Sequence, residues 1–136
     1  MAKVLPGGLS LAGVEDLKEI HDRALQAFAI ARDAGVPIAM GTDSSGTLCP
    51  FGEHARELEL YVAHGMSCEE ALATATSSAA ELRAIDDEVG LLTPGRMADV
   101  ILVDGDPLAD IRVLRQPGAI THVIQAGRLI AQRHED

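Results

Sequence analysis

The spacing of apolar residues first follows a helical period and later breaks into short β-branched runs. From residue 14 to residue 34, apolar side chains recur every three or four positions, which places them on one face of a helix. These side chains are Val14, Leu17, Ile20, Ala24, Phe28 and Ala31. Gly35 follows where a helix C-cap is expected, and residues 37–40 form a short apolar run. The pattern predicts a helix, a tight turn and a buried strand.

The middle of the chain alternates between loop composition and helical spacing. Residues 41–52 are rich in Gly, Ser, Thr and Pro, which is typical of a loop. Helical spacing resumes over residues 53–62. Ser67 and Glu70 then form an S-x-x-E capping box, in which the serine oxygen accepts a backbone N–H and the glutamate caps another. We therefore expect a further helix over residues 68–84.

The amino-acid composition changes after Gly95. Residues 99–103 and 120–125 are rich in β-branched side chains, and a turn at Ala126-Gly127 leads into a third run at 128–131. These patterns predict three strands.

This change in composition predicts that the chain has two structural parts, with a boundary near Asp86. Residues 1–86 are expected to form the helix–strand–helix layers of an α/β body. Residues 87–136 are expected to form a small β unit.

Composition supports a folded α/β protein. The chain has 136 residues, the size of one ordinary domain, and 47% of them are apolar. Aromatic residues make up only 2%. Any core must therefore be built from Ala, Val, Leu, Ile and Met, which suits helices packed on a sheet.

Charge and cysteine usage narrow the possible partners and setting. Eleven Lys and Arg against twenty-one Asp and Glu give a formal charge of −10, with the positive residues scattered, so no nucleic-acid partner is expected. Cys49 and Cys68 fit no metal-ligand spacing and are too few for a disulfide scaffold, which favours a cytoplasmic setting. No stretch approaches the roughly 18 to 20 apolar residues of a membrane span, and residues 1–8 are too short for a signal peptide.

The first candidate for chemistry is Asp43, which follows the apolar run at 37–40. An aspartate at the C-terminal end of a parallel strand lies where α/β barrels place catalytic groups, because the loops at that end form the mouth of the pocket. The alternative is that Asp43 only caps a turn or a helix, a common role for aspartate.

Four ordered motifs extend this picture. They are G-T-D-S at residues 41–44, an A-T-x-x-A-A run at 75–80, G-x-L-x-P-G-x-x-A-D at 90–99 and D-G-D-P at 104–107. In this order they resemble the metal-dependent amidohydrolase family, including its imidazolonepropionase and its Xaa-Pro and Xaa-Arg dipeptidase members. The resemblance covers residues 24–131, nearly the whole chain.

The resemblance implies a C-terminal fragment of a TIM-barrel amidohydrolase. The fragment would hold the last barrel strand with its flanking helices and part of a small β-sandwich domain. In the family, the aspartate matching Asp43 binds a divalent metal, usually zinc, and takes a proton from the metal-bound water that attacks an amide or related C–N bond. The implied substrates of the complete enzyme are small molecules such as dipeptides or cyclic amides.

The other metal ligands of the family come from earlier barrel strands. They are an H-x-H pair, a bridging lysine or glutamate and two further histidines. No two histidines of this chain form an H-x-H pair; they are His21, His54, His64, His122 and His134. Because one aspartate cannot hold a catalytic zinc, we expect no metal in the isolated chain.

Ser44 and His54 are the candidates for the substrate pocket. Ser44 has no G-x-S-x-G context and is otherwise a loop hydrogen-bonding residue. His54 lies in a region that family members use to shape the pocket. Many relatives carry a His-Gly step before this helix, whereas this chain has Phe51-Gly52, so no substrate preference is carried over.

Two classes of function therefore remain. The chain is expected to be part of a metal-dependent hydrolase and inactive in isolation, because the histidine and lysine ligands are absent. The alternative is a non-catalytic module for folding or association. An excised barrel segment exposes strand edges and apolar helix faces, so we also expect a homo-oligomer.

Overall fold

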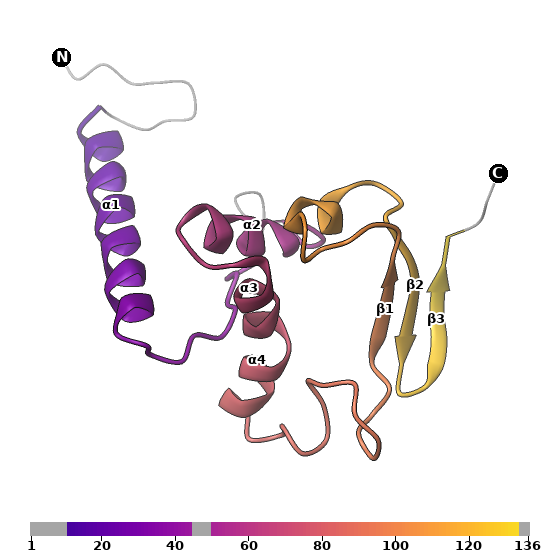
Figure 1. Cartoon of the computed structure of the whole chain (residues 1–136). Coiled ribbons are helices and arrows are strands. Elements are labelled where there is room, and N and C mark those ends of the chain that lie inside the picture. Colours follow the sequence, from indigo (N-terminus) through magenta and orange to yellow (C-terminus); the bar gives the residue numbers. More distant parts are fainter. Residues whose placement is uncertain (1–10, 45–49, 134–136) are drawn as a thin grey trace. The chain divides into compact units, whose positions relative to one another are not determined.

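The computed structural model describes residues 11–44 and 50–133, with side chains from residue 16 onward. The elements in chain order are α1 (Leu11–Asp33), α2 (Ala55–Ala63), α3 (Cys68–Ala75), α4 (Ser77–Leu82), β1 (Val100–Val103), the 3-10 helix η1 (Ile111–Arg115), β2 (Ile120–Gln125) and β3 (Arg128–Gln132) (Figure 1). The chain divides into two compact units between Pro37 and Ile38. No helix within the described ranges is long and apolar enough to cross a membrane.

The first unit contains α1, which confirms the helix expected from the apolar spacing. The helix ends at Gly35, whose φ of +68° is easy only for glycine. There the N–H of Gly35 donates to the carbonyl of Arg32 and the N–H of Val36 donates to that of Ala31, both at 2.9 Å. Leu17 and Ile20 on the apolar face are 53% and 63% exposed.

The second unit begins with the apolar run that was expected to be a strand, and this expectation is wrong for the chain as described. Residues 38–40 belong to none of the described strands. A strand needs a neighbour to pair its backbone groups, and none of the three described strands pairs with this segment. Instead, the N–H of Met40 donates to the carbonyl of Thr74 in α3 at 2.8 Å.

The helix α3 begins at the expected capping box. The Ser67 hydroxyl accepts from the N–H of Glu70 at 3.1 Å, and the Glu70 carboxylate accepts from the N–H of Ser67 at 2.7 Å. The single helix expected over residues 68–84 is instead broken at Thr76, where φ is −125° and ψ is −94°. The Thr76 hydroxyl donates to the carbonyl of Leu72 at 2.9 Å, a bond by which threonine competes with the helical backbone. The helix therefore divides into α3 and α4.

The three strands form one antiparallel sheet in the order β1-β2-β3. Val100 lies opposite Ile124 and Ile101 opposite Val123, while Val123 also lies opposite Ala131 in β3. The expected strands and the turn at Ala126-Gly127 are confirmed. Both β1 and β3 are edge strands of the described sheet.

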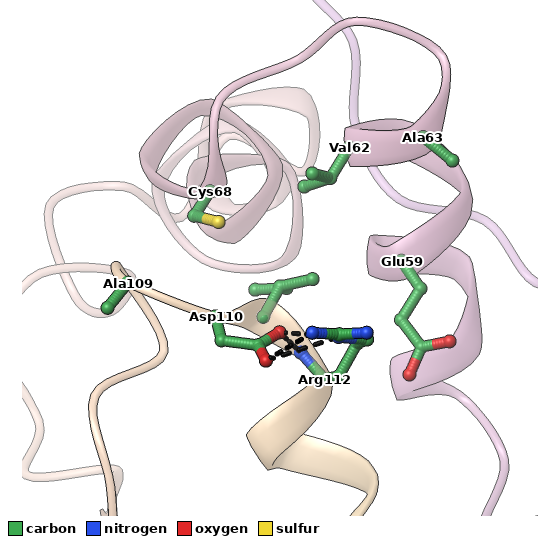
Figure 2. A pocket seen from close by; sticks show the side chains of 8 residues that line it. Glu59, Val62, Ala63, Cys68, Ala109, Asp110 and Arg112 are labelled. Carbon is green, nitrogen blue, oxygen red and sulfur yellow. Dashed lines mark hydrogen bonds and ion pairs between the residues drawn. The ribbon is translucent and has the colours of Figure 1, made fainter.

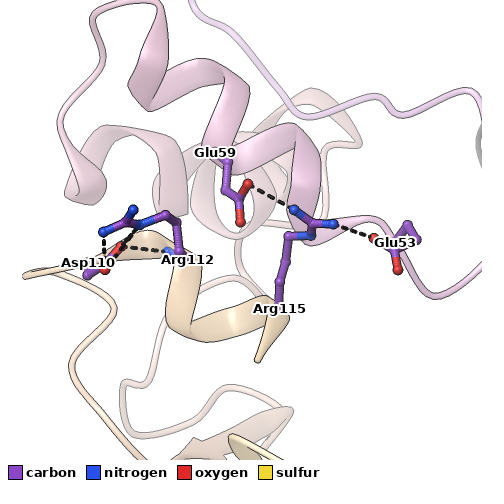
Figure 3. A network of polar contacts seen from close by, with 5 residues as sticks. All are labelled: Glu53, Glu59, Asp110, Arg112 and Arg115. Carbon is purple, nitrogen blue, oxygen red and sulfur yellow. Dashed lines mark hydrogen bonds and ion pairs between the residues drawn. The ribbon is translucent and has the colours of Figure 1, made fainter. Parts of the chain in front are cut away.

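The sequence analysis did not foresee η1, which ties the β part of this unit to α2. Asp110 caps it by accepting from the N–H of Arg112 at 3.0 Å. Arg115, at its end, pairs with Glu53 at 2.8 Å and with Glu59 at 3.0 Å (Figure 3). Because Glu53 lies just before α2 and Glu59 within it, one guanidinium joins two segments that are far apart in the sequence.

The core of the second unit is small and poor in aromatic side chains, as the composition predicted. Its buried apolar residues come mainly from α2, α3, α4 and η1, and they are Leu58, Tyr61, Met66, Ala71, Ala80, Ile111, Val113 and Ala119. Each buried Leu, Ile, Val or Met contributes on the order of 1.5–3 kcal/mol, and three of the eight core residues are the smaller alanine, so this core leaves little margin for cavities.

The G-x-L-x-P-G motif has a packing role at its first glycine. Gly90 has a φ of +93°, and a Cβ placed on it would lie 2.8 Å from the Cβ of Ala80 and 3.2 Å from the Cα of Ser77. Gly95 has almost the same φ, +94°, but a Cβ there would meet nothing within 4 Å. The first glycine therefore lets residues 89–91 approach α4, while the second serves only the turn.

The two glycines form a matched pair for mutation. We expect Gly95→Ala to cost about 1–2 kcal/mol of unfolding free energy, because alanine is strained at positive φ. Gly90→Ala should cost about 1–3 kcal/mol more, because it adds a steric clash to the same strain. Urea unfolding of both variants measures the difference. Equal costs would contradict the packing role of Gly90.

Candidate functional site

Asp43 lies in the irregular segment that begins the second unit. Its side chain is exposed, and its backbone φ is +47°, in the left-handed region that few non-glycine residues adopt. Aspartate tolerates this conformation better than most residues do. The carboxylate makes no hydrogen bond or ion pair with another described residue. The turn thus presents a charged oxygen pair that its described neighbours do not neutralise.

The two pocket candidates lie on either side of residues 45–49, which are outside the described residues. The half-buried Ser44 has its Oγ 2.8 Å from the Oγ1 of Thr42, so it bonds within the turn that carries Asp43. The exposed His54 occupies the N-cap position of α2 without a side-chain cap, and its ring centroid lies 6.3 Å from that of Phe51. The roles of Ser44 and His54 in a substrate pocket stay predictions.

The described residues do not fit a catalytic metal by themselves. Zinc sites in enzymes use three protein ligands and an open position, at distances near 2 Å. No group of three or more His, Cys, Asp or Glu side chains within residues 11–44 and 50–133 could hold a metal ion. Asp43 is therefore a lone candidate ligand within the described residues.

Tyr61 of α2 lies close to the segment that carries Asp43. Burial raises the pKa of Tyr61, whose side chain is mostly removed from water, and the negative charge of Glu57 raises it further. A hydrogen bond to the Gly41 backbone lowers the pKa, and only a donor can stabilise a phenolate, so the Gly41 group is its N–H. The bond to Glu57 raises the pKa, so there the phenol donates.

These causes place the Tyr61 phenol near both the Gly41 backbone and the Glu57 carboxylate, which lies one helical turn earlier. Sequence reasoning missed Tyr61. The available signal was that a buried tyrosine usually finds a partner for its hydroxyl, and this is the only tyrosine of the chain.

A separate hollow of about 460 Å³ lies between α2, α3 and the start of η1 (Figure 2). Its charged lining is already paired, because Arg112 bonds both carboxylate oxygens of Asp110, at 2.8 Å and 3.1 Å from its Nε. These bonds hold the pKa of Asp110 below its usual range. Glu59 of the lining is also paired, with Arg115, so the hollow offers the thiol of Cys68 and apolar side chains.

The environment of Tyr61 predicts how the chain titrates. Because the chain has one tyrosine and no tryptophan, the ultraviolet absorbance of tyrosinate reports Tyr61 alone. We expect a pKa above 10.0 in the folded chain and a return towards that ordinary value in urea. Since the folded pKa is raised, the phenol contributes stability that is present below pH 10.0 and is lost as pH rises through the folded pKa.

Substitution of Glu57 separates the causes of this shift. Glu57→Gln should lower the folded pKa of Tyr61 without abolishing the shift, because burial is the largest cause. Glu69→Gln, at an exposed position in the first turn of α3, is the matched control and should leave the titration unchanged. A folded Tyr61 that titrates at or below its value in urea would contradict the burial and the bond to Glu57.

Comparison with known proteins identifies the family of this chain. The sequence profile of the Amidohydrolase family matches residues 7–130. Ochratoxinase from Aspergillus niger is 39% identical over 115 residues, which are 83% of this chain and 23% of that protein. Imidazolonepropionase from Symbiobacterium thermophilum is 32% identical over 99 residues, 72% of this chain and 23% of that protein.

Solved structures of related proteins show the same relationship. The crystal structure of the Aspergillus niger ochratoxinase matches 90% of this chain and 28% of its own chain, with a TM-score of 0.80 and 37% identity. A Xaa-Pro dipeptidase with methionine bound in its active site matches 77% of this chain and 25% of its own, with a TM-score of 0.71 and 35% identity. This chain thus spans about a quarter of the length of these relatives. It belongs to the amidohydrolase family, as a C-terminal portion of a TIM-barrel enzyme of that family.

Proposed function

We propose that this chain is part of a metal-dependent amidohydrolase that cleaves C–N bonds, such as the amide bonds of dipeptides or cyclic amides. The observation that carries this proposal is the Asp43 turn, which presents an exposed carboxylate at the end of the G-T-D-S motif. The match of residues 7–130 to the family supports it. The names of the relatives, which include an ochratoxinase and a Xaa-Pro dipeptidase, support small or dipeptide-like substrates.

Asp43 is proposed as a ligand of a divalent metal in the complete enzyme, with zinc as the expected ion. Carboxylate oxygen is an accepted zinc ligand, but a site needs two or more further ligands. We propose that these come from another part of the enzyme, and that Ser44 and His54 border the substrate pocket. Residues 1–86 would then supply the end of the barrel, and residues 87–136 would supply part of the β-sandwich.

The same reasoning makes residues 1–136 inactive as an isolated chain. The described residues supply no second ligand next to Asp43. The alternative function, a non-catalytic folding or association module, is favoured for the isolated chain by its exposed sheet edges. A cytoplasmic setting and the absence of a nucleic-acid partner complete the proposal, on the basis of cysteine usage and the charge of −10.

A chimera tests the catalytic part of the proposal. Residues of this chain replace the matching quarter of the Aspergillus niger ochratoxinase, and the activity of that enzyme is measured. We expect a metal-dependent hydrolase whose kcat/KM falls roughly a hundredfold or more in Asp43→Asn, because a metal ligand is lost. Asp87→Asn, at an exposed position away from the turn, is the matched control and should retain the activity.

Two outcomes would contradict the proposed role of Asp43. One is a chimera whose activity survives Asp43→Asn. The other is a folded, metal-loaded chimera that is inactive even with Asp43 in place, a result that would favour the non-catalytic module. The isolated chain should show no hydrolysis of the same substrate.

Self-association is proposed for the isolated chain. In the described sheet, β1 and β3 each pair on one side only, and Leu129 and Ile130 of β3 are 55% and 59% exposed. An unpaired edge with exposed apolar side chains is a template for pairing with a second chain. The second copy is the natural partner, because every copy carries the same edge.

Light scattering after size-exclusion chromatography measures this association. We expect a dimer or larger species that shifts towards monomer in Leu129→Lys, because an edge lysine opposes pairing. Leu82→Lys places the same charge at a 76%-exposed position of α4 and should leave the association unchanged. A monodisperse monomer for the unmodified chain would refute the proposal.

A further inference from the structure

The start of α2, where the candidate pocket residue His54 lies, depends on support from other elements. Residues 41–52, which precede it, are rich in Gly, Ser, Thr and Pro, and α2 begins at His54 without a side-chain cap. Gly52 has a φ of +97°, and a Cβ placed on it would meet nothing within 4 Å, so close packing does not hold the chain at that residue. A helix start without a capping side chain unwinds more readily than a capped one. Contacts with other elements of the second unit therefore decide how firmly His54 is placed.

Arg115 of η1 provides such a contact (Figure 3). Its Nη2 donates to the Glu53 carboxylate at 2.8 Å, and its Nη1 donates to the Glu59 carboxylate at 3.0 Å. Glu53 directly precedes His54, whereas Glu59 lies in the middle of α2. A guanidinium is planar and carries its donors at fixed angles, so its bonds to two carboxylates fix both their separation and their orientation. These three side chains form the Arg115 clamp, which ties the start of α2 to its middle and both to η1.

The two arginines of η1 differ in what they hold. Arg112 bonds Asp110, two residues earlier in the chain, and its side chain is 73% exposed. The side chains of Arg115 and Glu59 are 36% and 24% exposed. Exposed ion pairs contribute little to stability and are easily screened by salt, whereas partly buried pairs are screened less. Of the two arginines, Arg115 is therefore the one that holds a neighbouring element in place.

The D-G-D-P motif sets the position of η1. Gly105 has a φ of +135°, and a Cβ placed on it would lie 2.6 Å from the Cγ2 of Val113, so glycine lets this turn approach η1 closely. The carbonyl of Asp106 accepts from the N–H of Asp110, the N-cap residue of η1, at 3.0 Å. Val113 is only 6% exposed, and Arg115 follows it by two residues. The motif therefore determines where η1 begins and from where Arg115 reaches α2.

We propose that Arg115 is a positioning residue for the His54 side of the substrate pocket, acting through Glu53, and that the D-G-D-P motif serves the pocket by seating η1. The inference rests on the proposed function, because it is the place of His54 at the pocket that makes the start of α2 important. Arg115 acts on the backbone before His54 and not on the substrate. The arginine and both carboxylates belong to this chain, so the clamp does not depend on the metal ligands that another part of the enzyme would supply.

Arg115→Met tests the clamp in the full chain, because methionine keeps an unbranched apolar side chain and removes the donors. The N–H groups of Arg56 and Glu57 close the first turn of α2 on the carbonyls of Glu53 and His54, both at 3.0 Å. Their hydrogen exchange, read by NMR, should accelerate roughly 3- to 10-fold, the effect expected for the loss of about one hydrogen bond from the local structure.

Two references separate this effect from a general loss of stability. The N–H of His64 closes the other end of α2 on the carbonyl of Leu60 at 2.9 Å and should keep its exchange rate. Arg112→Met is the matched control, because it removes the same donors from an arginine of η1 that is bonded to Asp110. It should leave the exchange of Glu57 unchanged.

Glu53→Gln completes a double-mutant cycle with Arg115→Met. The double variant should exchange no faster at Glu57 than Arg115→Met alone, because both substitutions act on the same bond. Effects that add, or unchanged rates in folded Arg115→Met, would overturn the inference. Should Arg115→Met fail to fold, Glu53→Gln alone gives the same test from the other side of the bond, at a side chain that is 49% exposed.

The ochratoxinase chimera tests the consequence for the pocket. Arg115→Met should raise its KM roughly threefold or more and leave kcat within about twofold, because His54 is loosened while Asp43 stays in place. Arg112→Met should change neither. An active chimera whose KM is unmoved by Arg115→Met would overturn the inference. Failure of the proposed function would be seen instead in Asp43→Asn, and the exchange rates still decide the clamp because they need neither metal nor activity.

Discussion

The hydrogen bond from the N–H of Met40 to the carbonyl of Thr74 ties the segment that leads to Asp43 to helix α3. A lone extended segment cannot pair its own backbone groups, so its position depends on acceptors that other elements provide. Here α3 provides one such acceptor, the carbonyl of Thr74. The capping box at Ser67 starts α3 and thereby sets where Thr74 lies. Local helix chemistry and the placement of the candidate catalytic group are thus physically linked.

Local signals in the sequence predicted most elements, since each depends on residues that are neighbours in the chain. Gly35 ends α1, and the residues of β2 and the turn at Ala126-Gly127 follow directly from β-branched and turn composition. The break at Thr76 was missed because the Thr76 hydroxyl bonds to the carbonyl of Leu72, a competition with the helical backbone that apolar spacing does not reveal. The strand expected at residues 37–40 failed because strand formation depends on neighbours, which composition does not reveal.

The candidate site could be predicted only in part. The G-T-D-S motif directed attention to Asp43, and the family profile places that motif in an amidohydrolase. The left-handed backbone of Asp43 could not be read from the sequence, because a residue other than glycine keeps that conformation only where its surroundings impose it. The sequence holds no H-x-H pair, so the histidine ligands of the family could not be assigned to positions in this chain.

The central claim is that this chain carries one ligand of a metal site and not the whole site. Elemental analysis of the purified chain after equilibration with zinc, next to Asp43→Ala, tests it most directly. The account predicts far less than one zinc per chain and no difference between the two proteins, because one carboxylate binds zinc too weakly to survive purification. Stoichiometric zinc that is lost in Asp43→Ala would contradict it, and would mean that copies of this chain assemble a complete site together.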